Sequence, residues 1–308
     1  MFQEKKVMFV YCVSPLHMGA GTALGAVDNP IQRERHTGHP VMAGSGIKGA
    51  LRHHLAIHKS AGGQQADLDV LFGPDPEGSA EHAGAVSFSD AQSVLFPVRS
   101  LRESYVYATS PTALERLRRM LVLCGIQQAA GWKIPKVGSD DQCVLLDDAL
   151  KASNKKLVLE SCQFSADDGG KAELEKVARW MSENGLPKDP GTEYFRSKIA
   201  RHLVLLSDNR FNYFVQHTTV VEPHVRISDE SGTAEDGGLF YTENLPAETL
   251  MAGMVLCSME RRKKGDTMKD LMQADNVLNA VTGLLDGSLV QMGGDATTGR
   301  GQVQIRFA

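Results

Sequence analysis

The stretch covering residues 14–52 constrains the fold of this chain more than any other part of its sequence. It holds seven glycines and one aspartate, and its first half shows no apolar period. A loop of this length inside a compact domain is usually either functional or disordered. The second half argues against disorder, because a Gly-Ser-Gly motif at 44–46 leads into the amphipathic run Ile47, Leu51 and Leu55. We therefore expect a functional loop that ends in a helix, with Ser45 as the N-cap.

The start of this helix is a predicted anion site. Backbone N–H groups in the first turn of a helix bind anions, and Lys48 and Arg52 lie four residues apart on one face. A second segment, residues 293–301, carries four glycines and Arg300 between two expected strands, and its N–H groups can form an anion-binding nest. A tight turn is the simpler interpretation of that second loop alone. Two such loops, one near each end of the chain, favour a shared path for a polymeric phosphate chain.

Asp28 is the single aspartate of the first loop. An isolated carboxylate in a phosphate-binding loop can be a metal ligand, a general base or an orienting group, or it can cap a turn. Residue chemistry alone favours the turn cap. The other three roles stay open at this point.

Composition excludes several classes of protein. The chain has 308 residues, 42% of them hydrophobic, and can bury a large core in one large domain or two smaller ones. Its net charge of −4 excludes a general polycation, so any contact with nucleic acid must come from local basic clusters such as residues 116–119. Five scattered cysteines without a C-x-x-C pair argue against structural zinc and are typical of the reducing cytosol. We expect a cytoplasmic protein without a signal peptide or membrane anchor.

Apolar patterning predicts a mixture of strands and helices. The longest expected helices cover residues 45–59, 112–124, 171–184, 192–206 and 268–286. Strands are expected at 6–13, 85–89, 93–98, 105–109, 156–164, 250–259, 289–292 and 302–307. Residues 211–227 and 238–241 resemble the two arms of a long hairpin around an acidic, exposed tip at 228–237. Such a hairpin has too small a core of its own, so it should project from the body.

One nucleotide-binding motif competes with a nucleic-acid path. Residues 44–49 match G-x-G-x-x-G, with Asp67 and Asp69 about twenty residues further on. A dinucleotide-dependent enzyme is therefore an alternative. The match is weak, because the acidic residue should follow a second strand and here follows Gly-Gly-Gln-Gln. The P-loop does not fit, because its lysine must be followed by Ser or Thr.

Three strings carry a resemblance to a known family: PLHMGAG at 15–21, LGAVDNPIQRE at 24–34 and GSGIKGALR at 44–52. The string LFGP at 71–74 and the glycine loop at 293–301 continue the match almost to the end of the chain. On these motifs the chain resembles the RAMP superfamily of CRISPR effector proteins. Within that superfamily it is most similar to the backbone subunit of the type III-B (Cmr) complex.

The resemblance implies an α+β fold made of one RAMP domain over residues 1–308. This fold has an RRM-like, ferredoxin-like palm, a helical insertion at about 112–206 and a protruding β-hairpin thumb at about 211–246. It also implies that several copies stack along a CRISPR RNA, and that each thumb splays out one nucleotide of a single-stranded target RNA. Further expected partners are the small helical subunit, the large polymerase-type or cyclase-type subunit and other RAMP subunits of a Cmr complex.

The implied activity is endonucleolytic cleavage of the complementary target RNA at regular intervals. The family needs a divalent metal ion, Mg²⁺ or Mn²⁺, and leaves a cyclic phosphate, which implies attack by the neighbouring 2′-OH. The essential acid falls on Asp28, which is then also the expected metal ligand, and this outweighs the turn-cap interpretation. A non-catalytic, structural RNA-binding RAMP subunit is the alternative.

Further site residues follow from the same comparison and from residue chemistry. His17 is a second acid or base candidate. Glu243, on the return arm of the hairpin, is a third, although its neighbours Thr242 and Asn244 depart from the family's pattern. The residues expected to grip guide phosphates are Gly44, Ser45, Gly46, Lys48, Gly49, Arg52, Gly294, Gly299, Arg300 and Gly301.

Overall fold

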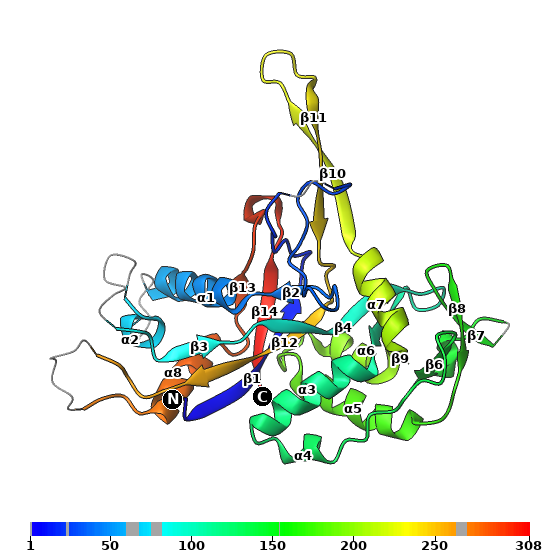
Figure 1. Cartoon of the computed structure of the whole chain (residues 1–308), viewed down its shortest axis with the longest axis horizontal. Coiled ribbons are helices and arrows are strands. Elements are labelled where there is room, and N and C mark those ends of the chain that lie inside the picture. Colours follow the sequence, from blue (N-terminus) through cyan, green and yellow to red (C-terminus); the bar gives the residue numbers. More distant parts are fainter. Residues whose placement is uncertain (1, 23–24, 60–67, 75–81, 154, 263–269) are drawn as a thin grey trace.

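The computed structural model describes residues 2–22, 25–59, 68–74, 82–153, 155–262 and 270–308. Within these residues, one sheet of twelve strands forms the body of the molecule, and a separate two-stranded ribbon projects from it (Figure 1). The mixed α+β class predicted from the sequence is confirmed. None of the described helices is long and apolar enough to cross a lipid bilayer.

Four antiparallel strands form the centre of the sheet, in the spatial order β14, β1, β12, β4. They are β14 (Gln302–Phe307), β1 (Glu4–Cys12), β12 (Leu250–Cys257) and β4 (Ala91–Arg99). Along the chain, helix α1 (Gly44–Lys59) follows β1 and helix α8 (Ala274–Leu285) follows β12. Three short strands pair with the four: β13 (Leu289–Gln291) with β14, β2 (Val41–Met42) with β4 and β3 (Val86–Phe88) with β12.

Both faces of β1 are buried because helices cover the sheet on each side. Successive side chains of a strand point to opposite faces, so Met8 and Val10 join one core and Val7 and Phe9 join the other. The first core also contains the apolar residues of α1 and α8. The second contains those of α3 (Pro111–Leu123), α5 (Lys171–Asn184) and α6 (Glu193–His202). Each fully buried Leu, Val or Phe contributes roughly 1.5–3 kcal/mol of hydrophobic free energy.

The segment between β4 and the hairpin was predicted to be a helical insertion at about 112–206, and this is only half correct. It also contributes strands that extend the sheet beyond β4, in the order β5 (Tyr105–Thr109), β9 (Leu203–Leu206), β6 (Gln142–Leu145), β8 (Cys162–Ala166) and β7 (Lys156–Leu159). The expected helix at 192–206 ends at His202, because the fully buried run Leu-Val-Leu-Leu forms β9, parallel to β5. Helix α4 (Gln127–Ala130) and the 3-10 turn η2 (Asp148–Leu150) complete this segment.

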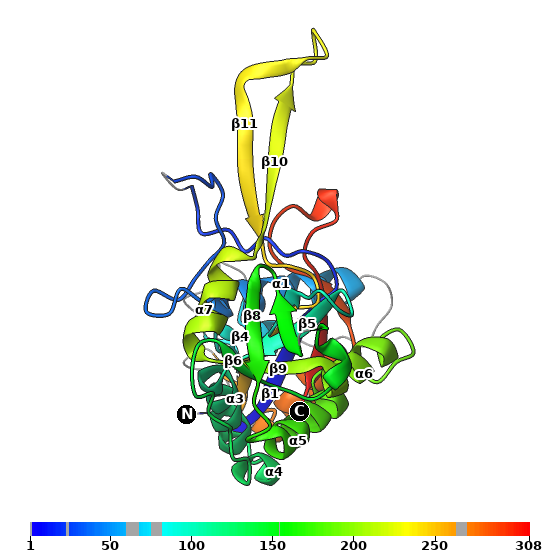
Figure 2. The same ribbon diagram turned by 90° about the vertical axis from the view of Figure 1, so that its right-hand side faces the viewer.

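The projecting ribbon consists of β10 (Val220–Ile227) and β11 (Ala234–Asn244), and Figure 2 shows it standing clear of the body. The prediction that its first arm starts at residue 211 is wrong, because residues 208–217 form helix α7 (Asp208–His217). Ser207 caps this helix by accepting a hydrogen bond from the N–H of Arg210. Phe211, Phe214 and Val215 are buried at helical spacing, so the aromatic run that resembled a strand is one face of a helix.

The start of α1 differs in detail from the prediction. Ser45 is not the N-cap, because the helix begins at Gly44 and the carbonyl of Ala43 accepts the hydrogen bond from the N–H of Ile47. A Cβ at position 44 would clash with the carbonyl of Phe88 in β3, so only glycine lets the helix begin so close to the sheet. The remaining short elements are α2 (Leu68–Phe72) and the 3-10 turn η3 (Ala296–Thr298) in the second glycine loop.

Candidate active site

The outer edge of β11 organises the candidate site. In the β10–β11 ribbon the N–H and C=O groups of alternate residues face away from the partner strand, and those of Tyr241 and Glu243 are bound by the first glycine-rich loop. The N–H of Asn29 donates to the carbonyl of Tyr241 and the carbonyl of Asn29 accepts from the N–H of Glu243, both at 3.0 Å. The loop that carries Asp28 is thereby held against the root of the hairpin.

Asp28 lies at this edge, half-buried. Its Oδ2 accepts a hydrogen bond from the N–H of Tyr241 at 2.7 Å, a contact between residues 213 positions apart. The carboxylate therefore caps a strand edge of the hairpin and not a local turn of its own loop. Its second oxygen has no hydrogen-bond partner among the described residues, so it is free to bind a hydroxyl, a proton or a cation.

His17 reaches the same edge two residues further along β11. Its Nδ1 lies 2.7 Å from the carbonyl oxygen of Glu243. A carbonyl oxygen can only accept a hydrogen bond, so Nδ1 carries the proton that forms this bond. Nε2 is therefore available to exchange a proton with a ligand. The edge of β11 thus holds both predicted acid–base groups, Asp28 through residue 241 and His17 through residue 243.

Glu243 is placed differently from the other two candidates. Its side chain is buried, with 6% of its surface exposed, and its carboxylate accepts from three groups. These are Nη2 of Arg33 at 2.5 Å, the N–H of Ile31 at 3.1 Å and the hydroxyl of Thr219 at 2.7 Å. Ile31 and Arg33 belong to the loop that carries Asp28, whereas Thr219 directly precedes β10. The carboxylate of Glu243 therefore braces the Asp28 loop against the hairpin and has little capacity left for a substrate.

A small pocket opens beside His17, where the two glycine-rich loops meet. Its volume is about 130 Å³, and its lining includes His17, Gly46 of the first turn of α1, Gly294 of the second loop and the side chains of Met18 and Met42. The N–H of Gly294 donates to the carbonyl of His17 at 2.9 Å, which fixes the second loop next to the first. The two loops, more than 200 residues apart in the sequence, do come together as expected.

The predicted cations have protein partners of their own. Nζ of Lys48 donates to the carbonyl of Val86 at 3.2 Å, and burial, with the charges of Arg52 and Arg261, lowers the pKa of Lys48. Arg52 contacts the carbonyl of Gly73 and the carboxylate of Asp69. Neither side chain lines the pocket beside His17.

Arg300 is held in a similar way, by the hairpin. Its Nη2 donates to both carboxylate oxygens of Glu222 on β10, at 2.7 and 2.6 Å. This ion pair ties the second glycine loop to the root of the ribbon. Of the remaining predicted contacts, Ser45, Gly49 and Gly299 are exposed, whereas the N–H of Gly301 is used by the carbonyl of Pro15.

The dinucleotide alternative finds no support in this geometry. Its fingerprint needs a parallel β-α-β unit, whereas both neighbours of β1 run antiparallel to it. Asp69 lies at the start of the short helix α2 and pairs with Arg52. Asp67 lies outside the described residues.

A metal site made of protein groups alone is also absent from the described part of the chain, where no three His, Cys, Asp or Glu side chains gather around one point. Mg²⁺ usually keeps several waters and binds through one or two carboxylates together with substrate phosphates. The single free oxygen of Asp28 fits that second kind of site. It does not fit a closed protein cage.

Comparison with known proteins agrees with this architecture. The model of the RAMP superfamily matches residues 9–304. The CRISPR system Cmr endoribonuclease Cmr4 of Pyrococcus furiosus is 34% identical over 296 residues, which cover 96% of this chain and 93% of that protein.

Solved structures give the same result for the fold. Oligomeric Cmr4 from Pyrococcus furiosus superimposes with a TM-score of 0.72 at 26% identity, covering 99% of this chain and 98% of that one. A chain of the type III-B Cmr-beta complex bound to cognate target RNA has a TM-score of 0.70 at 19% identity, with 99% and 98% covered. At that identity the second likeness supports the fold alone.

Proposed function

The chain belongs to the RAMP superfamily, and we propose that it is the backbone subunit of a type III-B CRISPR effector complex and its target-RNA endonuclease. Copies of the chain line up along a guide RNA, join the other Cmr subunits and cut the complementary target RNA. The relative at 34% identity is named a Cmr endoribonuclease, and Cmr4 from the same organism forms oligomers. The five cysteines are free thiols, as in a reducing cytoplasm.

In this proposal the parts of the fold take the roles expected of a RAMP protein. The four central antiparallel strands with α1 and α8 are the RRM-like, ferredoxin-like palm, and the chain order β-α-β-β-α-β with the spatial order β14, β1, β12, β4 supports this. The β10–β11 ribbon is the thumb. The pocket between the two glycine loops holds guide phosphate through the N–H groups of Ser45 and Gly46 in the first turn of α1. The nearest cations, Lys48 and Arg300, are engaged with protein groups, and so are the N–H groups of Gly44, Gly294 and Gly301.

One observation carries the nuclease assignment: Asp28 and His17 are bound at residues 241 and 243 of the same strand edge, each with one atom left for a ligand. In the reaction, the free oxygen of Asp28 accepts the proton of the target's 2′-OH. The 2′-oxygen then forms a bond to phosphorus and the bond from phosphorus to the 5′-oxygen breaks. Protonated Nε2 of His17 donates to that leaving oxygen, and a cyclic phosphate and a 5′-hydroxyl result.

Glu243 is a positioning residue in this scheme, because its carboxylate orders the segment next to Asp28 without an oxygen to spare. Because Asp28 has one free oxygen, holding a divalent ion is the alternative to its role as the base; such an ion, bound also by the target's phosphate oxygens, would supply charge neutralisation at the phosphate. The splayed geometry of the target nucleotide matters because a regular A-form duplex holds the 2′-OH out of line with its own phosphate.

Asp28→Asn in the assembled complex tests the proposal. The amide keeps an oxygen for the N–H of Tyr241 but cannot take a proton, so we expect target cleavage to fall at least 100-fold, within the usual size of a general-base effect, with guide binding unchanged. Asp168→Asn, at an exposed aspartate two residues after β8, is the matched control. Unchanged cleavage in Asp28→Asn would leave the non-catalytic, structural RAMP subunit as the better description.

The variants His17→Asn and His17→Gln test the roles of the two ring nitrogens of His17 separately. Asn places its amide near the position of Nδ1 and retains the bond to the carbonyl of Glu243, whereas Gln reaches toward the position of Nε2. Because neither titrates, both variants should lose cleavage by about 10²-fold or more, while His17→Asn keeps the wild-type melting temperature. Full activity of His17→Asn would reduce His17 to a structural contact.

A further inference from the structure

The root of the β10–β11 ribbon carries one carboxylate on each of its faces. Glu243 on β11 lies opposite Val221 on β10, and Glu222 is the next residue of β10. Because cross-strand neighbours share a face and successive side chains of a strand alternate between faces, Glu222 and Glu243 lie on opposite faces of the ribbon. The strand edge that binds both acid–base groups of the site runs through residues 241–243. The partners of the two carboxylates therefore decide where this edge lies.

Arg33 holds the first face of the ribbon root. Its Nη2 donates to the carboxylate of Glu243 at 2.5 Å, and its Nη1 donates to the carbonyls of Gly38 and Val215 at 2.7 and 2.9 Å. Val215 belongs to helix α7, and Arg33 itself belongs to the first glycine-rich loop. The carboxylate on this face is therefore fixed relative to both of these segments.

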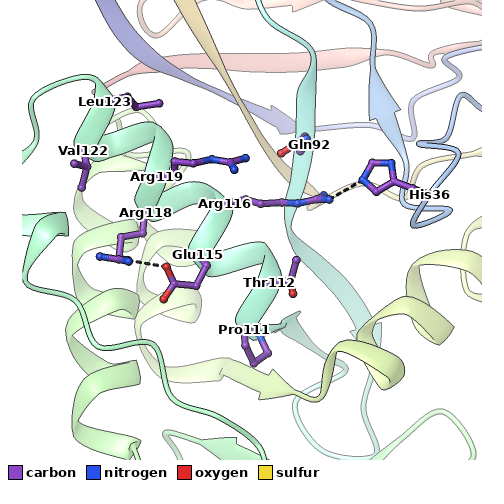
Figure 3. A pocket seen from close by; sticks show the side chains of 10 residues that line it. All are labelled: His36, Gln92, Pro111, Thr112, Glu115, Arg116, Arg118, Arg119, Val122 and Leu123. Atoms are coloured by element: carbon purple, nitrogen blue, oxygen red, sulfur yellow. Dashed lines mark hydrogen bonds and ion pairs between the residues drawn. The ribbon is translucent and has the colours of Figure 1, made fainter.

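The residue after Arg33 anchors the same loop to helix α3. The carboxylate of Glu34 accepts hydrogen bonds from Nη1 of Arg116 at 2.9 Å and from Nε2 of Gln92 on β4 at 2.8 Å. Figure 3 shows Arg116 extending from α3 to His36, whose Nε2 accepts from Nη2 of Arg116 at 3.1 Å, beside a groove of about 860 Å³. The first loop therefore cannot shift without breaking a largely buried ion pair.

Arg300 holds the second face, from the glycine-rich loop that lines the pocket beside His17. Its Nη2 donates to both carboxylate oxygens of Glu222 at 2.7 and 2.6 Å, and Nδ2 of Asn244 donates to the same carboxylate at 3.2 Å. The carbonyl of Arg300 accepts from Nε2 of Gln291 on β13 at 2.8 Å. The carboxylate on this face is thereby fixed relative to the second glycine-rich loop and to the sheet.

Asn244 indicates that this contact does not serve stability alone. The residue has 1% of its surface exposed, and its Oδ1 has no hydrogen-bond partner among the described residues. A buried amide oxygen without a partner costs about 1–3 kcal/mol. A leucine of similar volume would avoid this cost, but it could not orient the carboxylate of Glu222 through a hydrogen bond. Local arrangements that lower stability in this way are typical of functional sites.

We propose that Arg300, Glu222 and Asn244 are positioning residues for target cleavage. Together with the pair of Arg33 and Glu243 on the other face, they clamp the ribbon root, so that the catalytic edge keeps a fixed place relative to the pocket between the glycine loops. This inference rests on the proposed function, in which that pocket holds guide phosphate. The clamp then transmits the position of the guide to the groups that cut the target.

Glu222→Gln and Asn244→Leu test the clamp in the assembled complex. We expect the single-turnover rate of target cleavage to fall about tenfold or more in each variant, because small displacements of catalytic groups have effects of this size. Guide affinity, target affinity and the shape of the pH profile should not change, since Asp28 and His17 keep their own contacts. Asn244→Leu should retain the wild-type melting temperature, because it loses one hydrogen bond and one unpaired oxygen together. Wild-type cleavage rates in both variants would overturn the proposal.

Glu235→Gln is the matched control, because it removes an exposed ion pair with Arg226 farther along the same ribbon. Its cleavage rate should equal that of the wild type. Arg300→Gln should lower cleavage as Glu222→Gln does and leave guide affinity unchanged. If Arg300→Gln weakens guide binding while Glu222→Gln cleaves normally, Arg300 is a guide contact and the proposal is wrong. A wild-type complex that binds guide and target without cutting would remove the nuclease assignment itself, whereas normal cleavage in Glu222→Gln removes only the clamp.

The position of the ribbon is measured by pulsed electron spin resonance. Nitroxide labels are placed at Glu230→Cys on the ribbon tip and Arg179→Cys on α5, with the partly buried Cys124 and Cys162 replaced by Ser. We expect a narrow distribution of label-to-label distances in this background and a clearly broader one after Glu222→Gln. Equal widths would show that the ion pair does not hold the ribbon, and the proposal would fall.

Discussion

At the scale of single residues, Glu243 is the clearest case of a side chain whose partners decide its role. The Glu243→Gln substitution removes the negative charge that pairs with the half-buried guanidinium of Arg33. It also weakens the hydrogen bonds that the carboxylate accepts from Ile31 and Thr219. Breaking one side of such a pair costs about 1–3 kcal/mol. We expect Glu243→Gln to lower the melting temperature, and cleavage to fall with the loss of order around Asp28.

The control for this prediction is Glu175→Gln on α5, which removes an exposed ion pair with Arg179. Pairs of that kind contribute about 0–1 kcal/mol, so its melting temperature should hardly change. A Glu243→Gln protein with wild-type stability and no cleavage would contradict the positioning role and assign Glu243 to the chemistry.

Glu248 gives the residue-scale prediction about pH. It precedes β12 at a φ of +70°, one of its carboxylate oxygens is buried without a hydrogen bond, and burial raises its pKa from 4.5 to about 7. The folded state therefore binds a proton that the unfolded state has already released between pH 4.5 and 7. Stability is highest below pH 4.5 on this account and is lost as the pH rises through 7.

Glu248→Gln should remove that dependence. Because the group is partly exposed, we expect the variant to be more stable than the wild type at pH 8.5 by about 1–2 kcal/mol, less than the full pKa shift would give. At pH 4 the two proteins should have similar melting temperatures. Other titrating groups cancel in the difference between variant and wild type. A difference that stays constant from pH 4 to 8.5 would show that the carboxyl group does not titrate in this range.

The site shows which residue roles can be read from a sequence. The chemistry of the two glycine loops and the family resemblance together pointed to Asp28, His17 and the pocket between the loops. The partner of Glu243 could not be found in this way, because Arg33 lies 210 positions away and no local pattern connects them. The same holds for Arg300, whose expected phosphate contact is replaced here by Glu222 on the hairpin.

At the scale of elements, prediction succeeded where an apolar period was long and failed where two elements followed each other without a break. The period of α1 and the alternation of β14 placed both elements to within about two residues. The predicted helix at 192–206 merged helix α6 with strand β9, which follows it directly. The predicted hairpin arm at 211–227 likewise merged helix α7 with strand β10. In both cases tertiary burial selects the structure, and no glycine or proline marks the boundary.

The second glycine loop yields a prediction at this scale. Gly293 has a φ of +74°, and a Cβ at this position would clash with the carbonyl of His17. Gly293→Ala therefore has to shift the loop away from His17, which we expect to cost about 2–4 kcal/mol and to reduce guide binding. Differential scanning calorimetry and a filter-binding assay measure the two effects.

Gly299 in the same loop is the matched control. Its φ of +81° is equally unusual, but no atom lies within 4 Å of an added Cβ. Gly299→Ala should therefore show only the backbone cost of about 1 kcal/mol. Equal effects of the two substitutions would mean that backbone strain, and not the contact with His17, determines how the loop holds its position.

At the scale of the whole molecule, the distribution of charge predicts how guide binding responds to salt. The chain carries a net charge of −4, and Lys48, Arg52 and Arg300 all have protein partners. Under the proposed function, guide phosphates are held chiefly by backbone N–H groups, which release few counterions. For a single strand, the logarithm of the association constant falls with the logarithm of salt concentration at a slope of about −0.7 for each phosphate neutralised.

We therefore expect a slope between about 0 and −1.5 for each bound copy, corresponding to two neutralised phosphates or fewer, in titrations of a labelled guide from 50 to 300 mM KCl. Arg300→Gln should leave that slope unchanged if Arg300 stays with Glu222, and the same holds for Lys48→Gln with its carbonyl partner. A slope steeper than about −3 that becomes shallower in either variant would mean that these side chains exchange their protein partners for phosphate when the guide binds. In that case the ion pair between Arg300 and Glu222 is a resting contact, and binding of the guide would release the second glycine loop from the root of the hairpin.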